Sequence, residues 1–578
     1  MEYAVSSLKI STKTKSSVKN ESIKLVKDGE IKEYKVRIEF EKEESPSVFS
    51  IIWEEPQIDM IGFWSSKAGF VNNLSPDWMM RCEESRSASG MPIACLFNKA
   101  NDNRMTIALS DPMSPAKIMA GVVEENGNLR FQIDLFSQVC PKMKEYEVTV
   151  RIDKRSISLC QAIKDARKWY HELGYKNAYV PMGAKMPLYS AWYSFHQNTI
   201  PDQIIEECKK AKEYGMDTLI VDDGWQTEDG SRGYAFCGDW EICKSKIPDM
   251  KYFVDEIHKL GMKFMIWFSV PFVGTESKNF EKFKGKYLNP NADTNHYTLD
   301  PRFPEVREFL VNTYVRYVKE YGWDGLKLDF IDSFKLTEDS SCDYENMDFI
   351  SLEEAVNELL RQAYSELTKI NPEFLIEFRQ SYIGPVVMQY GNMIRVGDCP
   401  NDALTNRKNS IGLRLTCEEI PVHSDMLMWN KADTNESVMY QLLGVMFSVP
   451  QISIRFDNIT NDHKMLLKNF LTFWKTHSDT ILSGELTACD VEASYSMAKA
   501  SKDGESVAVL YQNVVYKAEK DEKSYIFNST GNDYIYLELD MDCEYEAYDM
   551  MGNVTSNGKI KAGVQRLNVE NCGMIMTF

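Results

Sequence analysis

Charged side chains follow short apolar runs at several points in the middle of the chain. In the run Leu326-Lys-Leu-Asp-Phe330, strand alternation places Lys327 and Asp329 on one side and the two leucines on the other. A nearby lysine cation favours the ionised carboxylate and lowers its pKa. We therefore predict that Asp329 is a carboxylate nucleophile at the end of a strand. A structural ion pair is the alternative interpretation.

Carboxylate chemistry of this kind needs a second acid from a later strand. Asp398 lies just past the short run that begins at Met393, in a turn that contains glycine and proline. An Asx-turn before a loop is the plainer interpretation of such a position. Asp402, four residues further on, is a rival candidate. From these residues alone, Asp398 and Asp402 are both candidates for the acid/base partner of Asp329.

Further residues could hold a neutral polyol substrate. Asp222 and Asp223 end the apolar run Thr218-Leu-Ile-Val221. Adjacent carboxylates repel each other unless a partner holds them, and sugar hydroxyls are suitable partners; helix N-capping is the alternative. A tryptophan face can stack on a sugar, although a lone tryptophan is more often part of a core. The tryptophans considered are Trp192, Trp225, Trp240 and Trp267, and the fixed donors and acceptors expected beside them are Glu377, Arg379 and Arg395.

A repeated pattern of helix, stop signal and short strand must position these residues. The first copy is an amphipathic segment at 199–215 followed by the apolar run 218–221, and further copies end in the runs 263–268, 324–329 and 374–377. This rhythm is typical of βα units around a parallel sheet. A doubly wound sheet should open with a glycine-rich phosphate loop, which is not seen after any of these runs. We favour a (β/α)₈ barrel, whose active site lies at the carboxyl ends of its strands.

The flanking regions alternate with period two, which predicts antiparallel β-structure. We expect an N-terminal β-sandwich over residues 1–180, the catalytic barrel over 181–484, and a small C-terminal antiparallel β-sandwich domain over 485–578.

The net charge of −20 argues against nucleic acid and anionic membranes as partners. No apolar leader is evident and the thirteen cysteines form no CxxC pair, so we expect a cytoplasmic protein with reduced thiols. Seven scattered histidines give little material for a metal site, and we expect neither a metal nor an organic cofactor. The oligomeric state is left open, with a homo-oligomer among the alternatives.

Together these motifs resemble the α-galactosidases of glycoside hydrolase family 36. Asp222-Asp223-Gly224-Trp225 resembles the family's acidic pair, which binds the 4- and 6-hydroxyls of the galactosyl unit. Lys327-Leu-Asp329 is similar to its nucleophile motif, and Arg395-Val-Gly-Asp398 to its acid/base segment. The segment around Gly238-Asp-Trp240, the strand that carries Trp267, and Trp192 near the first barrel strand also match. Two departures, the segment 377–384 and Ser269, change the expected contacts of the sugar.

The resemblance implies a retaining exo-α-glycosidase that removes terminal α-galactose from small oligosaccharides. Asp329 would attack the anomeric carbon while Asp398 protonates the leaving oxygen, and Asp398 would then activate water. This mechanism places the two carboxyl groups about 5 to 5.5 Å apart. The alternatives are an α-N-acetylgalactosaminidase, an α-galactosyl transglycosylase, and a sugar-binding protein without catalysis.

Overall fold

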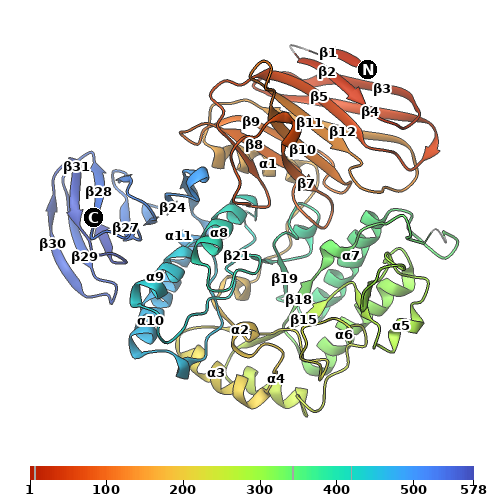
Figure 1. Cartoon of the computed structure of the whole chain (residues 1–578). Helices are drawn as coiled ribbons and strands as arrows, with labels where there is room; N and C mark the ends of the chain where they lie inside the picture. Colours follow the sequence, from red (N-terminus) through yellow and green to blue (C-terminus); the bar gives the residue numbers. More distant parts are fainter. Residues whose placement is uncertain (6–7, 342–343, 418) are drawn as a thin grey trace.

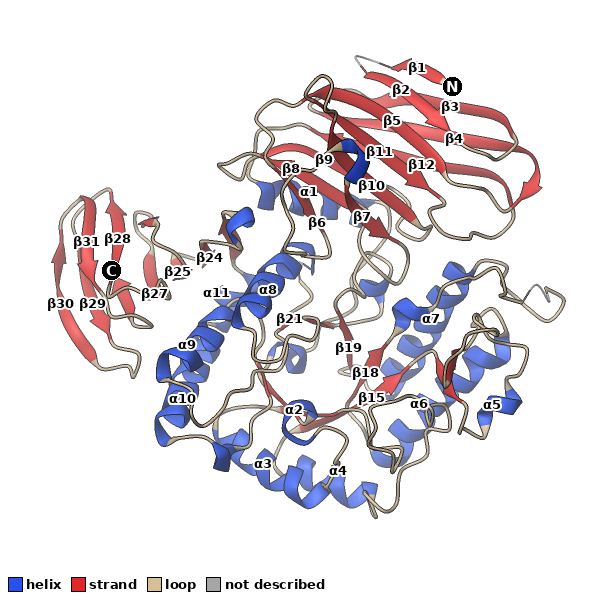
Figure 2. Cartoon of the chain, viewed as in Figure 1, coloured by secondary structure: helices blue, strands red, loops and turns tan. Residues whose placement is uncertain are grey.

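The computed structural model describes residues 1–5, 8–341, 344–417 and 419–578, which fold into three consecutive parts. Figure 1 shows the N-terminal sheets in red, the helices and strands of the barrel in yellow to cyan, and the C-terminal sheets in blue. Figure 2 shows that helices are concentrated in the middle part. Among the described residues, no helix carries an apolar stretch long enough to cross a membrane.

The N-terminal part is a sandwich of two six-stranded sheets, as its period-two alternation predicts. Along β4 (Ile31–Glu44), Tyr34, Val36, Ile38 and Phe40 are buried, whereas Lys35 is exposed. The first sheet has the order β1 (Glu2–Val5), β2 (Leu8–Lys13), β5 (Phe49–Pro56), β11 (Asn128–Leu135), β10 (Ala116–Val122) and β7 (Arg81–Ser85). The second has the order β3 (Val18–Lys27), β4, β12 (Met143–Asp153), β9 (Asn103–Leu109), β8 (Ile93–Phe97) and β6 (Gly62–Ser65). Helix α1 (Leu159–Glu172) leads out of the sandwich, capped by Ser158.

The middle part confirms the parallel barrel. Eight strands pair in chain order, and β13 closes the ring by pairing in parallel with β22. A parallel bridge between His423 and Val449 joins β21 to the residues just before β22. The strands are β13 (Leu188–Ser190), β14 (Thr218–Val221), β15 (Lys263–Ser269), β18 (Gly325–Asp329), β19 (Leu375–Arg379), β20 (Met393–Arg395), β21 (Val422–His423) and β22 (Gln451–Ile452). A hairpin of β16 (Phe272–Gly274) and β17 (His296–Thr298) follows β15.

Several helix ends coincide with residues that favour them. Pro201 occupies the first turn of its helix, Asp249 and Ser351 cap theirs, and Gly322 ends its helix in the left-handed conformation. The helices are α2 (Trp192–Phe195), α3 (Pro201–Glu213), α4 (Met250–Lys259), α5 (Asn279–Lys282), α6 (Pro304–Tyr321), α7 (Leu352–Ile370), α8 (Ala403–Cys417), α9 (Asn435–Gly444), α10 (Asn461–Thr476) and α11 (Ser478–Ser483).

The barrel interior changes from apolar to charged along the strands. At the amino ends an apolar cluster fills the interior, formed by Ala184, Leu188, Ile220, Met265, Leu375 and Met393. The next inward positions, two residues further along each strand, include Asp222, Trp267, Lys327, Glu377 and Arg395, all buried. The apolar cluster therefore fills the barrel interior at one end, and the charged interior side chains lie toward the other.

The C-terminal part differs from the expected antiparallel domain in two strand pairs. It consists of a seven-stranded and a three-stranded sheet, in which β25 pairs in parallel with β27, and β26 with β28. The chain leaves β25, forms β26 in the other sheet, and returns; such a crossover permits parallel pairing. The larger sheet contains β23 (Glu485–Cys489), β24 (Met497–Lys502), β25 (Glu505–Leu510), β27 (Lys523–Asn528), β32 (Met574–Thr577), β29 (Cys543–Tyr548) and β30 (Val554–Ile560). The smaller contains β26 (Val515–Lys517), β28 (Tyr534–Leu539) and β31 (Gly563–Asn568).

Candidate active site

Asp329, the last residue of β18, lies at the carboxyl end of the barrel among fixed hydrogen-bond donors. Its Oδ1 accepts from Arg379 Nε and from the Tyr382 hydroxyl, both at 2.7 Å, and its Oδ2 accepts from Trp267 Nε1 at 3.1 Å. The Tyr382 hydroxyl also accepts a bond from the backbone N–H of Phe330, which has a left-handed φ of 64°. The carboxylate is thus fixed in orientation from three sides.

The charges around Asp329 keep it ionised. Burial alone would raise the pKa of this carboxyl, but the Arg379 and Lys327 cations, together with the Tyr382 hydrogen bond, hold its pKa far below the ordinary range. The effect of Lys327 agrees with the sequence-based expectation. The nearest cation is nevertheless Arg379, and Lys327 forms its ion pair with Asp222 instead. These contacts therefore favour the ionised form of Asp329.

Asp222 and Asp223 follow β14 and lie in the same mouth. Asp222 accepts from Lys327 and from the backbone N–H of Asp223. Asp223 accepts from the side-chain amides of Gln197 at 2.6 Å and Gln226 at 2.7 Å, and burial raises its pKa. The positive φ of Gly224 brings its backbone against Gln197, where a Cβ would lie 2.6 Å from the Gln197 Cα. The pair is held by side-chain partners rather than by capping a helix.

Asp398 lies on an exposed loop after β20, and its side chain is 57% accessible. Arg395 donates to it at 2.8 Å and holds its pKa below the ordinary value, with burial acting in the opposite direction. The fully buried Arg395 guanidinium also donates to Asp425. Asp398 is therefore oriented by one guanidinium but remains open to solvent and substrate.

Asp402, the rival candidate, has a local structural role. Its carboxylate accepts from the backbone N–H and the hydroxyl of Thr405, in the first turn of α8. This is the N-cap arrangement, and the side chain is exposed on the loop. Its contacts favour Asp398 over Asp402 as the partner of Asp329.

The four tryptophans occupy different positions. Trp267 donates to Asp329, and Trp192 is partly exposed after β13, with its ring 4.2 Å from that of His196. Trp225 and Trp240 are almost fully buried and stack at 6.2 Å, and the Trp225 indole N–H donates to the backbone oxygen of Trp267. The expectation that Trp225 contacts substrate is therefore corrected: its position after the strand directs its ring into the layer between barrel and helices.

Glu377 also lies deeper than expected. It is fully buried, accepts from Gln451 at 2.6 Å, and lies 3.8 Å from Arg395 Nε. Burial raises the pKa of its carboxyl. Because no part of it is exposed, Glu377 supports Arg395 from below rather than contacting the sugar.

Sequence reasoning missed Tyr382 and Asp425. Asp425 follows β21, is fully buried, and accepts from the Tyr193 hydroxyl at 2.9 Å and from the Cys399 N–H at 2.7 Å. It thereby joins β21 to the loop that carries Asp398. Tyr382 lies in the segment 377–384, where the motif departs from the family pattern. Both residues lie within three positions of the end of a barrel strand. A search for polar residues just beyond strand ends could therefore have identified them from the sequence.

The N-terminal sandwich reaches this end of the barrel through Lys67, which follows β6, and Arg86, which follows β7. Arg86 donates to the backbone oxygens of Asp332 and Phe334, just beyond β18. Gln380, next to the last residue of β19, donates to the Lys67 oxygen at 2.7 Å and accepts from the Gly397 N–H at 3.0 Å. The sandwich thus supports the two loops that carry Tyr382 and Asp398.

The melibiase family model matches residues 170–484, more than half of the chain. The α-galactosidase Mel36A of Lactobacillus acidophilus is 29% identical over 154 residues, 25% of this chain and 20% of that protein. Alpha-galactosidase 1 of Pediococcus pentosaceus is 27% identical over 129 residues, 21% of this chain and 17% of that protein. The matches thus span about a fifth of the length of these curated relatives.

Solved structures share the fold at low sequence identity. A variant of the family 36 α-galactosidase AgaA from Geobacillus stearothermophilus, in complex with stachyose, matches with a TM-score of 0.64 at 14% identity, over 95% of this chain and 79% of that one. The α-galactosidase from Lactobacillus brevis matches with a TM-score of 0.63 at 13% identity, over 98% and 85%. The family match and the geometry of the barrel mouth confirm the resemblance seen in the motifs: the chain belongs to the melibiase family.

Proposed function

We propose that the chain is a retaining exo-α-galactosidase that acts on short α-galactosides. The observation that carries this proposal is the environment of Asp329, a buried carboxylate held ionised by Arg379 and oriented by Tyr382 and Trp267. Such a carboxylate is prepared to attack an electrophilic carbon and is unsuited to donate a proton. The named α-galactosidases among the relatives support the galactoside as substrate.

Two steps follow from this arrangement. In the first, an Asp329 oxygen bonds to the anomeric carbon as the glycosidic bond breaks, and Asp398 gives its proton to the leaving oxygen. In the second, Asp398 takes a proton from water, whose oxygen attacks the same carbon and releases Asp329. Two inversions leave the sugar with its original α configuration.

Asp398 must be protonated before the first step. Arg395 holds its pKa low in the substrate-free protein, where its side chain is largely exposed. A neutral sugar that covers this carboxyl removes water from it and raises its pKa. Binding of substrate therefore favours the protonated form that the first step requires.

The substrate would be held by the residues around Asp329. We assign the acidic pair Asp222 and Asp223 to hydroxyls of the sugar, because both follow β14 at the carboxyl end of the barrel and are held there by side-chain amides and Lys327. Trp192 is the partly exposed ring available to a sugar face.

The proposal is tested with p-nitrophenyl α-galactoside beside the α-glucoside and the α-N-acetylgalactosaminide. We expect turnover of the galactoside alone, abolished in Asp329→Asn, and NMR of the first product formed should show the α anomer. Turnover of the N-acetyl substrate would reassign specificity, and an initial β anomer would exclude the retaining mechanism. Transfer of galactose to an added sugar in preference to water would make the chain a transglycosylase.

We also propose a cytoplasmic location. The described cysteines are free thiols, and many of them are buried, as expected in a reducing compartment. Fractionation of the source cells tests this, and activity in the culture medium would contradict it.

A further inference from the structure

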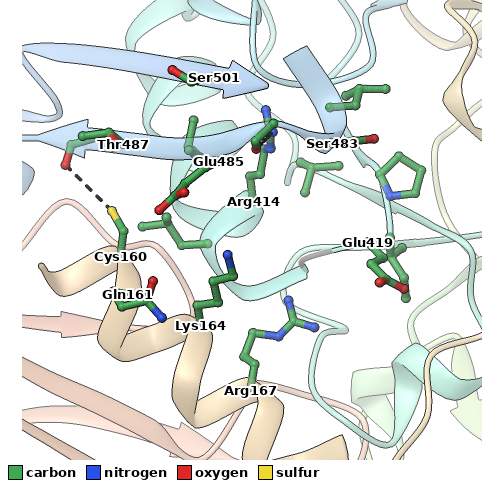
Figure 3. Close-up of a pocket in the computed structure, with 18 of the residues that line it drawn as sticks. Cys160, Gln161, Lys164, Arg167, Arg414, Glu419, Ser483, Glu485, Thr487 and Ser501 are labelled. Atoms are coloured by element: carbon green, nitrogen blue, oxygen red, sulfur yellow. Dashed lines mark hydrogen bonds between the residues drawn. The ribbon is translucent and has the colours of Figure 1, made fainter. Parts of the chain in front are cut away.

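A cavity of about 900 Å³ lies where the three parts of the chain meet. Its walls come from α1, from the segment that precedes β21, and from β23 and β24 (Figure 3). Pro421 and Val422 line it at the start of β21, and Lys185 lines it just before β13. The cavity is therefore at the amino ends of the barrel strands, opposite the mouth that holds Asp329.

The described residues of the lining carry more cations than carboxylates, in a strongly acidic protein. Among the described residues of the lining, the carboxylates are those of Glu419 and Glu485, and the cations are those of Lys164, Arg167, Lys185, Arg414 and Lys502. The whole chain has a net charge of −20. A local reversal of sign within a concave site attracts and retains anions.

Arg414 is a buried cation of this lining. Its guanidinium donates to the backbone oxygens of Ile481 and Gly484, at the end of α11. Within the described part of the chain, no carboxylate lies within ion-pair distance of it, and burial lowers its pKa to about 9. Backbone oxygens, including that of Phe447, hold the charged guanidinium, and a bound anion would supply the counter-charge that no described carboxylate provides.

Lys164 and Lys185 complete the cationic set. Among the residues that the structure describes, neither forms an ion pair, whereas Lys502 is already paired with Asp479 at 2.8 Å. Figure 3 shows Lys164 and Arg167 extending from α1 into the space that Arg414 borders from the other side. Cations on separate elements thus converge on one volume.

We propose that this junction cavity binds a small phosphate-bearing molecule. A phosphate group carries about two negative charges and several acceptor oxygens, which suits Arg and Lys donors that approach from different directions. The cavity has room for a monosaccharide attached to the phosphate. Such a ligand would link the sandwich, barrel and C-terminal domain, and the proposal does not depend on the glycosidase activity.

The experiment measures binding to the full-length protein by titration calorimetry and by the shift in Tm. The probes are inorganic phosphate and glucose 6-phosphate, with free glucose and sodium chloride of matched ionic strength as controls. For wild type we expect saturable binding of one equivalent and a rise in Tm of about 1–2 °C. Lys164→Gln and Lys185→Gln should each weaken binding by about 10-fold or more, because each removes a charge-assisted hydrogen bond.

Lys168→Gln is the matched control, because Lys168 is on the same helix as Lys164 but is exposed and does not line the cavity. Its affinity should equal that of wild type. Tighter binding of glucose 6-phosphate would identify a sugar phosphate, and equal affinities would identify the phosphate group itself; both support the proposal. Absence of binding by both probes, or equal weakening by Lys168→Gln, would overturn it.

Discussion

The two carboxylates at the barrel mouth lie in opposite kinds of environment. Asp329 is buried at the end of a strand and accepts bonds from Arg379, Tyr382 and Trp267. Asp398 is on a loop, exposed, and bonded to Arg395 alone among described side chains. A nucleophile gains from fixed position and permanent charge, whereas a proton donor must exchange protons. The difference in burial therefore supports the two roles that we propose for these carboxylates.

The largest effect should come from removing either carboxylate and comparing leaving groups. Asp329→Asn removes the nucleophile, so kcat should fall by about 10⁴-fold or more for every α-galactoside. Asp398→Asn removes the proton donor, so the loss of glycosidic bond cleavage should be large for raffinose but small for aryl galactosides with acidic phenols. Burst and steady-state kinetics over a series of aryl galactosides measure this. If the activity of both variants depended on the leaving group to the same extent, the assignment of Asp329 as nucleophile and Asp398 as proton donor would be wrong.

Arg379→Met tests what keeps Asp329 ionised. Asp329 must be ionised to attack, and its depressed pKa keeps it so as the pH falls. Without the cation this pKa rises, by about one to three units. The acid limb of kcat/KM should move to higher pH, with a loss of about 10²-fold at neutral pH. Arg361→Met, at a guanidinium of α7 that pairs with Glu358, is the control, and an unmoved acid limb would show that Arg379 does not set the charge of Asp329.

The sequence predicts the strands and helices that hold these carboxylates because each element depends on residues close together in the chain. Alternation within β18 places Lys327 and Asp329 inward, and the helix signals at Pro201, Gly322 and Ser351 lie within a few residues of the ends they determine. The barrel follows from the order of such units.

Contacts between distant residues could not be read in the same way. Tyr382 meets Asp329 across 53 positions, and Tyr193 meets Asp425 across 232. No repeating pattern of residues in the sequence indicates either contact. Trp225 failed as a prediction because it lies beyond the strand, where alternation no longer defines its direction. The parallel pairs of the C-terminal sheets were missed because alternation describes the faces of a strand and says nothing about its neighbours.

Asp425→Asn tests how Asp398 is positioned. Asn has an amide group in place of one carboxylate oxygen, so it cannot satisfy Arg395, Tyr193 and the Cys399 N–H together. We expect kcat/KM for raffinose to fall by about 10-fold, with much less change for an activated aryl galactoside. Asp457→Asn, at an exposed carboxylate paired with Lys210, should change neither. An equal loss on both substrates would mean that Asp425 stabilises the mouth as a whole rather than the Asp398 loop.

The smallest effect on catalysis should come from Asp402→Ala, although it removes a carboxylate only four positions from Asp398. Asp402 bonds the Thr405 N–H and hydroxyl, so its loss should lower the free energy of unfolding by about 1 kcal/mol through the start of α8. Denaturant titration measures this, and Asp402→Ser, which keeps a capping oxygen, should restore most of it. Activity of both variants should match wild type on raffinose and aryl galactosides alike. If Asp402→Ala lost activity in proportion to leaving-group basicity, and Asp398→Asn did not, the exposed loop would still supply the proton donor, but from the residue that caps the helix.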